Sequence, residues 1–307
     1  MEENKHLDEE VDLRELTSVL WRGRYFIIIL TIISFAAGSL YLRNADLKYN
    51  VSILLAPTNQ EETQANFGNF GNLAALAGIS LPSSNHSDLI KFELMLKTRE
   101  LSSQIFEDKN LIRELFSGEW NDQEQLFIEP KTTLKTAIKN NIRVVLTGKQ
   151  PKEYLSPNPA RLSEFIKRRI RITRNKNTQF ISMSAESSNP ELYQRLIMNM
   201  IYTTDALIKK SFMSQSKDAV SFYQNKISKA RSKEHREILA ALIAKEEKKL
   251  LLASREGPFV VEILTGPNIS LQPTSPKISI TLLLSIVLGF FFSSGILLIR
   301  NFLNKNH

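Results

Sequence analysis

Cysteine is absent from the 307 residues of the sequence. This excludes a disulfide framework and any zinc site built on thiolates, although a large domain can still fold outside the cytoplasm without disulfides. Histidine is also scarce. The four histidines, His6, His86, His235 and His307, are scattered along the chain without the spacing of metal ligands. We therefore expect no metal site.

A phosphate-binding loop is missing as well. Gly148 and Lys149 superficially resemble the end of such a loop, but Arg143 stands where the motif requires glycine, and Gln150 stands where it requires Ser or Thr. No other group of residues has the spacing of a catalytic or cofactor-binding motif. The sequence therefore predicts a protein that uses no cofactor and is not an enzyme.

Two long apolar runs without charge organise the chain. Tyr25–Leu42 covers 18 residues and Ile278–Ile299 covers 22. A helix needs roughly 20 apolar residues to cross the hydrocarbon core of a membrane. We expect both runs to be transmembrane helices, with the first at the short end of the usual length.

Each run also has a competing interpretation. The first could be a cleaved signal peptide, but the leader before it is long and acidic, whereas signal peptides begin short and basic. The second could be a buried core helix, but only eight residues follow it. Both alternatives are therefore less favoured than membrane spans.

The basic residues next to the two runs predict how the chain is oriented. Arg22 and Arg24 precede the first run, and Arg300 and Lys305 follow the second. Because such residues stay on the cytoplasmic side, we expect both termini in the cytoplasm. The predicted division is a cytoplasmic tail over 1–24, a span over 25–42, a periplasmic domain over 43–277, a span over 278–299 and a cytoplasmic tail over 300–307.

The net charge of +8 is concentrated in the segment 43–277. This segment holds 34 of the 40 Lys and Arg residues and 25 of the 32 Asp and Glu residues, a net charge of +9. With this segment outside the cytoplasm, the positive charge does not indicate nucleic acid as a partner.

Hydrophobic periodicity predicts strands and helices in this segment. The fold class that we expect is α+β, with an α/β base close to the membrane and a long helical arm. The predicted strands are 48–57, 166–173, 178–184 and 258–264, with a turn at 174–177. The predicted helices are 87–116, with Ser87 as N-cap, a short one around 131–140, and a long stretch over 189–254. A loop of small residues is predicted over 66–84.

The stretch 189–254 is too long for one compact globular helix. Asn189 is placed to cap it and Pro190 to occupy its first helical position. It is either one long helix or a helical hairpin that turns near 228–234, and the sequence leaves both open.

Basic residues alternate along the strand predicted over 166–173. Lys167, Arg169 and Arg171 would share one face. This pattern predicts either a surface close to anionic membrane lipid or an ordinary solvated sheet face.

Small residues recur in the apolar runs. Helices in lipid associate by close approach of their backbones, so a face of small residues predicts helix packing. The residues are Ser285, Gly289, Ser293 and Gly295 in the second run and Ser34 and Gly38 in the first. The alternative is that the glycines simply face lipid.

A proline-rich segment, 266–277 (GPNISLQPTSPK), stands directly before the second run. Proline fixes φ and lacks a backbone donor, so we expect the segment to be extended and separate from the helix. Pro267, Pro273 and Pro276, followed by Lys277, would make it either a stiff strut or a simple linker.

This segment resembles the proline-rich signature of the polysaccharide co-polymerases, the Wzz or chain-length determinant family. Asp12–Leu13 with 20–24 (LWRGR), the small-residue stretch 73–79 (LAALAGI), and Asn189–Pro190 at the start of a long helix also resemble that family. These landmarks follow in the right order over essentially the whole chain, except that 118–159 carries none. Since the chain ends at His307, the resemblance is to the type without a cytoplasmic tyrosine-kinase domain.

The resemblance implies a homo-oligomeric ring in the bacterial inner membrane. Such a ring sets how far a polysaccharide polymerase extends a lipid-linked glycan, such as O-antigen, enterobacterial common antigen or capsule. Its partners would be membrane lipid, the polymerase and the glycan. A two-helix sensor with a periplasmic ligand-binding domain is the alternative, but the short tails carry no signalling domain. A membrane-anchored hydrolase would need a catalytic cluster.

Overall fold

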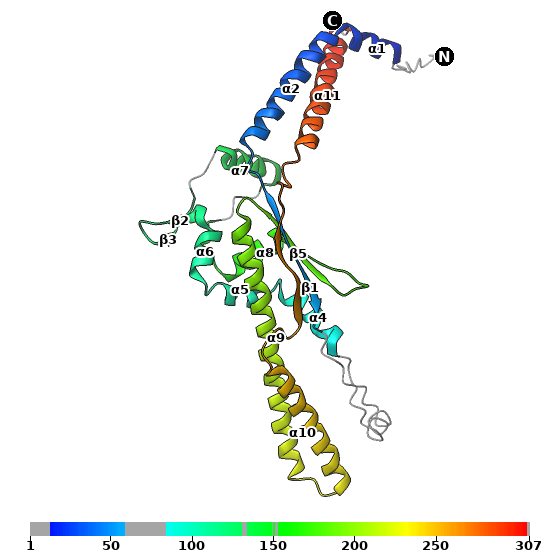
Figure 1. Ribbon diagram of the computed structural model, residues 1–307. Helices are drawn as coiled ribbons and strands as arrows, with labels where there is room; N and C mark the ends of the chain where they lie inside the picture. Colours follow the sequence, from blue (N-terminus) through cyan, green and yellow to red (C-terminus); the bar gives the residue numbers. More distant parts are fainter. Residues whose placement is uncertain (1–12, 59–83, 131–133, 149, 151–152, 306–307) are drawn as a thin grey trace, which may run out of the picture. The chain divides into compact units, whose positions relative to one another are not determined.

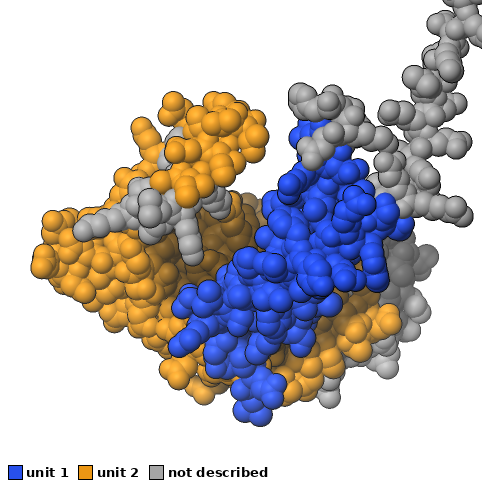
Figure 2. Space-filling view, turned by 90° about the horizontal axis from the view of Figure 1, so that it is seen from above, with its two compact units in different colours: residues 1–49, 271–307 blue, residues 50–270 orange. Residues whose placement is uncertain are grey.

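The computed structural model describes residues 13–58, 84–130, 134–148, 150 and 153–305. The chain divides into two compact units, which are coloured separately in Figure 2. We call residues 1–49 with 271–307 the apolar unit and residues 50–270 the mixed unit. The two ends of the chain thus belong to one unit, and the mixed unit is inserted between them.

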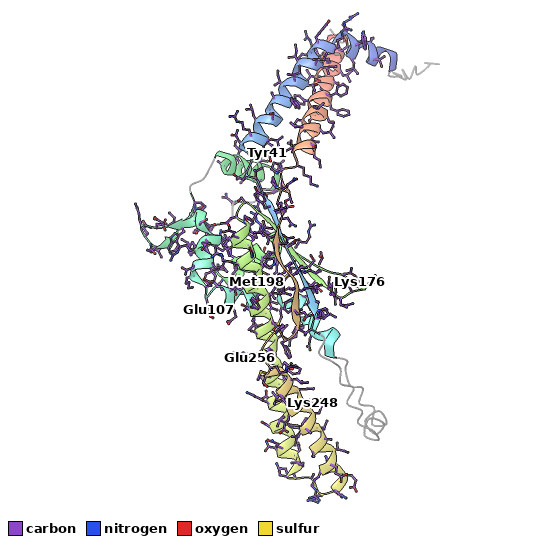
Figure 3. All side chains as sticks on the ribbon, viewed as in Figure 1. Tyr41, Glu107, Lys176, Met198, Lys248 and Glu256 are labelled. Atoms are coloured by element: carbon purple, nitrogen blue, oxygen red, sulfur yellow. The ribbon has the colours of Figure 1, made fainter. Side chains whose placement is uncertain are left out.

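The apolar unit consists of α1 (Leu13–Arg22), α2 (Arg24–Asn44) and α11 (Ile278–Lys305), and α2 packs along α11 (Figure 1). By length and composition, Arg24–Asn44 and Ile278–Asn301 are candidate membrane spans, with mean hydropathies of 2.1 and 2.5. They contain the two predicted spans. No residue of α2 is buried, and Tyr41 near its end is 61% exposed (Figure 3). Such an apolar surface is suited to lipid.

A four-stranded sheet forms the centre of the mixed unit. Its strands are β1 (Tyr49–Pro57), β4 (Ile170–Arg174), β5 (Ile181–Ser187) and β6 (Val261–Ile269), in the order β4-β5-β1-β6. The outer pairs are both antiparallel, with Ile170 opposite Ala185 and Val51 opposite Ile269. Strands from the beginning and the end of the unit therefore lie side by side.

Helices cover this sheet and close the core. They are α4 (Ser84–Met95), α5 (Arg99–Ile105), α6 (Lys109–Leu115), α8 (Pro159–Arg169) and the first half of α9 (Pro190–Ile227). Alternate residues of β1, Val51, Ile53 and Leu55, are fully or almost fully buried, as period-2 patterning requires. They share one core with Phe92 of α4 and Leu196 of α9.

The segment between α6 and α8 contributes little to the core in its described parts, where Phe127 packs against the core cluster. It contains a 3₁₀ turn (η1, Ser117–Glu119), a small hairpin of β2 (Trp120–Asn121) and β3 (Leu126–Phe127), and α7 (Leu134–Thr147). The short helix expected around 131–140 is thus longer and ends later. The small-residue loop expected over 66–84 lies outside the described residues except for Ser84, which begins α4.

The single helical pattern predicted over 87–116 is wrong in detail, because it is three helices. α4 already begins at Ser84, so Ser87 is not its N-cap. The breaks fall where side chains cap new helices. Thr98 Oγ1 accepts a hydrogen bond from the Leu101 amide at 3.3 Å, and Asp108 Oδ1 accepts one from Leu111 at 3.0 Å.

The strand predicted over 166–173 is also wrong in its first half. Residues up to Arg169 belong to α8, which Asn158 caps with Pro159 in its first turn. The buried residues Leu162 and Ile166 are one helical turn apart. Only from Ile170 does burial alternate, and β4 starts there.

The long stretch 189–254 is a helical hairpin. α9 ends at Ile227, and α10 (Lys233–Ala253) starts after a short turn and packs back along α9 (Figure 1). Ser232 caps α10, and the Asn189 side chain accepts a hydrogen bond from the Leu192 amide at 3.2 Å. The predicted cap at Asn189 is present, and of the two alternatives left open, the hairpin with a turn near 228–234 is the one observed.

Candidate functional site

The contact between α2 and α11 is the first candidate functional feature, because it holds the two candidate spans together. The Ser34 hydroxyl donates a hydrogen bond of 2.7 Å to the backbone carbonyl of Ser285. Gly38, one turn further along α2, faces the Ser285 side chain so closely that a Cβ at position 38 would overlap its hydroxyl. The Ser285 hydroxyl itself donates to the Thr281 carbonyl at 2.8 Å. Its hydrogen-bonding capacity is therefore used within the helix, which suits an apolar surrounding.

Gly289 lies close to the backbone of α2. A Cβ built at this position would lie 2.7 Å from Ser34 Cβ and 3.0 Å from Thr31 Cα. Both distances are shorter than normal carbon–carbon contact, so only glycine fits. Four of the six small residues singled out in the sequence, Ser34, Gly38, Ser285 and Gly289, therefore meet at one contact.

The other two small residues are not among these close approaches. Ser293 is buried, but its hydroxyl donates to the Phe290 carbonyl of its own helix at 2.9 Å. A Cβ at Gly295 would meet no atom within 4 Å. In the sequence Gly295 lies near the four-residue repeat of Ser285, Gly289 and Ser293, and the structure leaves it outside the close contact.

Two residues of this contact were not predicted. Thr31 lies against Gly289, and its hydroxyl is satisfied by the Ile27 carbonyl at 2.8 Å. Thr31 is three residues from Ser34 and seven from Gly38, so it lies on the same helical face. This spacing would have identified Thr31 as a packing residue. Gly23, between α1 and α2, is contacted by the Leu297 side chain, and its isolated position gave no such signal.

The proline segment is held by backbone hydrogen bonds at both of its ends. In the apolar unit, the Lys48 amide donates to the Ser275 carbonyl at 2.9 Å, and the Thr274 amide donates to the Lys48 carbonyl at 2.7 Å. In the mixed unit, the Ser270 amide donates to the Asn50 carbonyl at 2.9 Å. The segment is therefore more than an unattached linker.

The prolines of this segment occupy different environments. Pro267 lies in β6, an edge strand, at an irregularity in its pairing with β1, where a missing amide is tolerated. Pro273 is exposed and Pro276 half-buried. The Lys277 carbonyl accepts from the Thr281 amide at 2.9 Å, and α11 begins at Ile278.

The basic residues Lys167, Arg169 and Arg171 do not share a strand face. Lys167 and Arg169 lie in the last turn of α8, and only Arg171 lies in β4. All three are exposed. A helix C-terminus favours cations, which explains the position of the first two without any ligand.

A half-buried charged cluster fastens α8 to the preceding segment. The Arg161 guanidinium donates to Glu119 Oε2 at 2.6 Å and to the Leu155 carbonyl at 2.7 Å. Tyr154 donates to the same carboxylate oxygen at 3.0 Å. Partial burial and the bond to Glu119 raise the pKa of Tyr154 above its usual value, so the phenol stays a donor. The described residues contain no group of three or more His, Cys, Asp or Glu residues that could hold a metal ion.

A buried carboxylate links α9 to the start of β6. Asp205 is only 8% exposed, and its two oxygens accept hydrogen bonds from the amides of Phe259 at 2.8 Å and Val260 at 2.7 Å. These bonds compensate for the burial of the charge. Lys209, one turn later, donates to the Arg255 carbonyl at 2.7 Å. This corner fixes where the chain leaves α10.

Comparison with known proteins gives a family match and a structural similarity. Residues 9–108 match the family model Wzz, chain length determinant protein. The matched range contains α2, β1 and α5 and ends directly before α6. A solved structure described as a full-length bacterial polysaccharide co-polymerase is similar with a TM-score of 0.38 and 16% identity, covering 96% of this chain and 99% of that chain. The comparison with curated proteins finds no match.

Proposed function

We propose that this chain regulates polysaccharide chain length as a co-polymerase without catalytic activity, anchored in a bacterial inner membrane. The observation that carries the proposal is the match of residues 9–108 to the chain length determinant family. The glycan would be of the O-antigen, enterobacterial common antigen or capsule type, and the partner would be its polymerase.

The distribution of charge supports a specific orientation in the membrane. Arg22 and Arg24 lie at one end of the α2 span, and Arg300 follows the apolar part of α11. Cytoplasmic flanks are enriched in such residues. The two termini would then lie in the cytoplasm and the mixed unit in the periplasm, where a lipid-linked glycan is extended.

A regulator of this kind acts through position and shape. The α2–α11 contact would make the two spans move as one body, because a carbonyl bond and two close glycine approaches join them. The α9–α10 hairpin would present a long surface to neighbouring copies in a ring. The assembled ring would then limit how long the polymerase keeps extending each chain.

The proposal is tested by deletion of the gene and sizing of the surface polysaccharide on gels. The deletion strain should lose its preferred chain length, and the wild-type chain should restore it. Restoration must be compared at equal protein level, measured by immunoblot. An unchanged length distribution in the deletion strain contradicts the proposal.

The proposed orientation has a separate test, because the chain has no native cysteine. Arg231→Cys in the α9–α10 turn should react with a membrane-impermeant maleimide added to spheroplasts. Lys305→Cys should react only after the membrane is permeabilised. The reverse pattern would invert the proposed orientation.

A further inference from the structure

α7 carries an apolar face that the described parts of the chain leave open. The exposed fractions are 58% for Ile138, 53% for Ile142, 82% for Val145 and 78% for Leu146. None of these residues belongs to the hydrophobic core cluster of the described residues. Four large apolar side chains exposed on one short helix are more than the single exposed residues that are normal on a surface.

The four residues form one continuous stripe. They are spaced at i, i+4, i+7 and i+8, so at about 100° per residue they fall within an arc of roughly 100°. Thr147 falls on the opposite side of the helix. The helix is therefore amphipathic, although its apolar side does not face the core.

Basic residues accompany this stripe in the sequence. Lys131, Lys135, Lys139 and Arg143 recur every four positions, and no Asp or Glu occurs from Pro130 to Gln150. At about 100° per residue, Lys139 and Arg143 fall beyond one edge of the apolar arc, Lys135 falls within it, and the uncharged Asn141 falls beyond the other edge. An apolar stripe accompanied by positive and no negative charge is typical of a helix that lies in the surface of an anionic membrane.

The connections to the candidate spans limit how far the mixed unit can be from the membrane. β1 begins five residues after α2 ends, and α11 begins nine residues after β6 ends. At about 3.5 Å per residue these connections extend over roughly 18 Å and 32 Å at most. If α2 and α11 cross the membrane, the start of β1 and the end of β6 are therefore tethered within these distances of it.

We propose that α7 is a third membrane contact, an interfacial helix that lies in the headgroup region with Ile138, Ile142, Val145 and Leu146 buried in lipid. The proposal rests on the membrane anchoring contained in the proposed function. α7 lies beyond residues 9–108, which match the family model. The basic residues of α7 would add attraction to an anionic surface.

The test uses single cysteines in the full chain, because the natural sequence provides a cysteine-free background. Val145→Cys is labelled with an environment-sensitive fluorophore, and the protein is reconstituted in lipid nanodiscs containing phosphatidylcholine and phosphatidylglycerol. Thr147→Cys on the opposite face is the matched control. Ile29→Cys on α2, which is 59% exposed, is the reference for a site inside the membrane.

We expect lipid-attached nitroxide to quench the label at 145 about twofold or more beyond the label at 147. Iodide in water should quench the label at 147 more than the label at 145. Equal quenching of both labels by iodide would show an apolar face in water and overturn the proposal. Shielding of the 145 label from both quenchers would indicate a second copy or another protein on this face, and would overturn it as well.

The reference label at Ile29→Cys distinguishes a failure of the inference about α7 from a failure of the membrane anchoring. If nitroxide quenches Ile29→Cys but not Val145→Cys, only the inference about α7 fails. If it quenches neither, the membrane anchoring fails and the inference falls with it. Glycan sizing in the deletion strain judges the chain-length function independently. Discs of phosphatidylcholine alone should weaken the quenching at 145, and unchanged quenching would overturn the electrostatic part of the proposal.

Discussion

The Ser34 hydroxyl on α2 bonds the Ser285 carbonyl on α11 across 251 positions of sequence. The bond needs a backbone approach so close that a side chain at Gly289 would collide with Ser34. The hydrogen bond and the missing side chain thus support each other. Hydrogen bonds of this kind between helices in membranes contribute about 0.6 kcal/mol on average, so packing is the larger part of the contact.

Gly289→Leu should therefore separate α2 from α11. The added side chain must displace Ser34 and Thr31, and overpacking of this kind costs about 1–3 kcal/mol. We expect a lower melting temperature of the full chain in detergent and weaker detergent-resistant assembly in crosslinking. Gly295→Leu is the matched control, because no atom lies within 4 Å of its Cβ position. If both variants melt and crosslink like the wild type, the contact has no role in helix association.

Asp205→Ala should destabilise the mixed unit. The substitution leaves the buried amides of Phe259 and Val260 without their acceptor, and each loss costs about 1–3 kcal/mol. Asp205→Asn keeps one acceptor oxygen and should fall between alanine and wild type in thermal unfolding. Asp218→Ala, at an exposed position of the same helix, should melt like the wild type. An Asp205→Ala protein with an unchanged melting temperature would show that the two bonds are not needed.

Replacement of Pro273 and Pro276 by alanine should change glycan length without loss of protein. Neither proline provides a backbone donor or belongs to the core cluster, so folding and membrane insertion should be kept. A stiff segment predicts that the length distribution shifts or broadens, since the added flexibility uncouples β6 from α11. Pro130→Ala, an exposed proline outside the segment, is the control. A simple linker predicts an unchanged distribution at normal protein level, and that result would reject the stiff segment.

Exchange of Lys167, Arg169 and Arg171 for glutamine tests whether this basic surface lies near lipid. The three side chains are exposed, so stability should change by less than about 0.5 kcal/mol. A fluorophore at Thr173→Cys, next to them on β4, should be quenched by nitroxide on lipid headgroups in anionic nanodiscs. The glutamine variant should reduce that quenching. A label at Arg231→Cys serves as the distant comparison, and equal signals at 173 and 231 would support a solvated surface.

The sequence predicted the strands around β1 and β6 and the cap of α9 because each depends on local patterning. It misplaced the boundary between α8 and β4 for a physical reason. Ile170 and Ile172 alternate as in a strand, while Ile166 follows Leu162 at helical spacing. The residues from Ile166 to Ile170 therefore fit both the helical and the strand pattern. Only packing against the core determines that the helix continues to Arg169.

The same limit applies to the candidate site. Gly289 and Gly295 have identical chemistry and lie in the same apolar run, so their sequence context marks both as packing residues. The four-residue repeat of Ser285, Gly289 and Ser293 favours Gly289, but which face of α11 meets α2 depends on the rotation of one helix against the other, and no local pattern contains that information. Thr31 is the opposite case, since its position on the face of Ser34 and Gly38 was available from spacing.

The α9–α10 hairpin has a mechanical consequence. α9 is one uninterrupted helix of 38 residues, about 57 Å long. Its buried core residues end at Ile208, and Phe212 and Met213 still pack against the core. Beyond Met213 the helix has α10 as its main neighbour. A sideways displacement of the hairpin tip would rotate α9 about its anchored part near Asp205. Because Asp205 holds Phe259 and Val260 at the start of β6, a sideways force on the tip of the hairpin would reach that strand as torque.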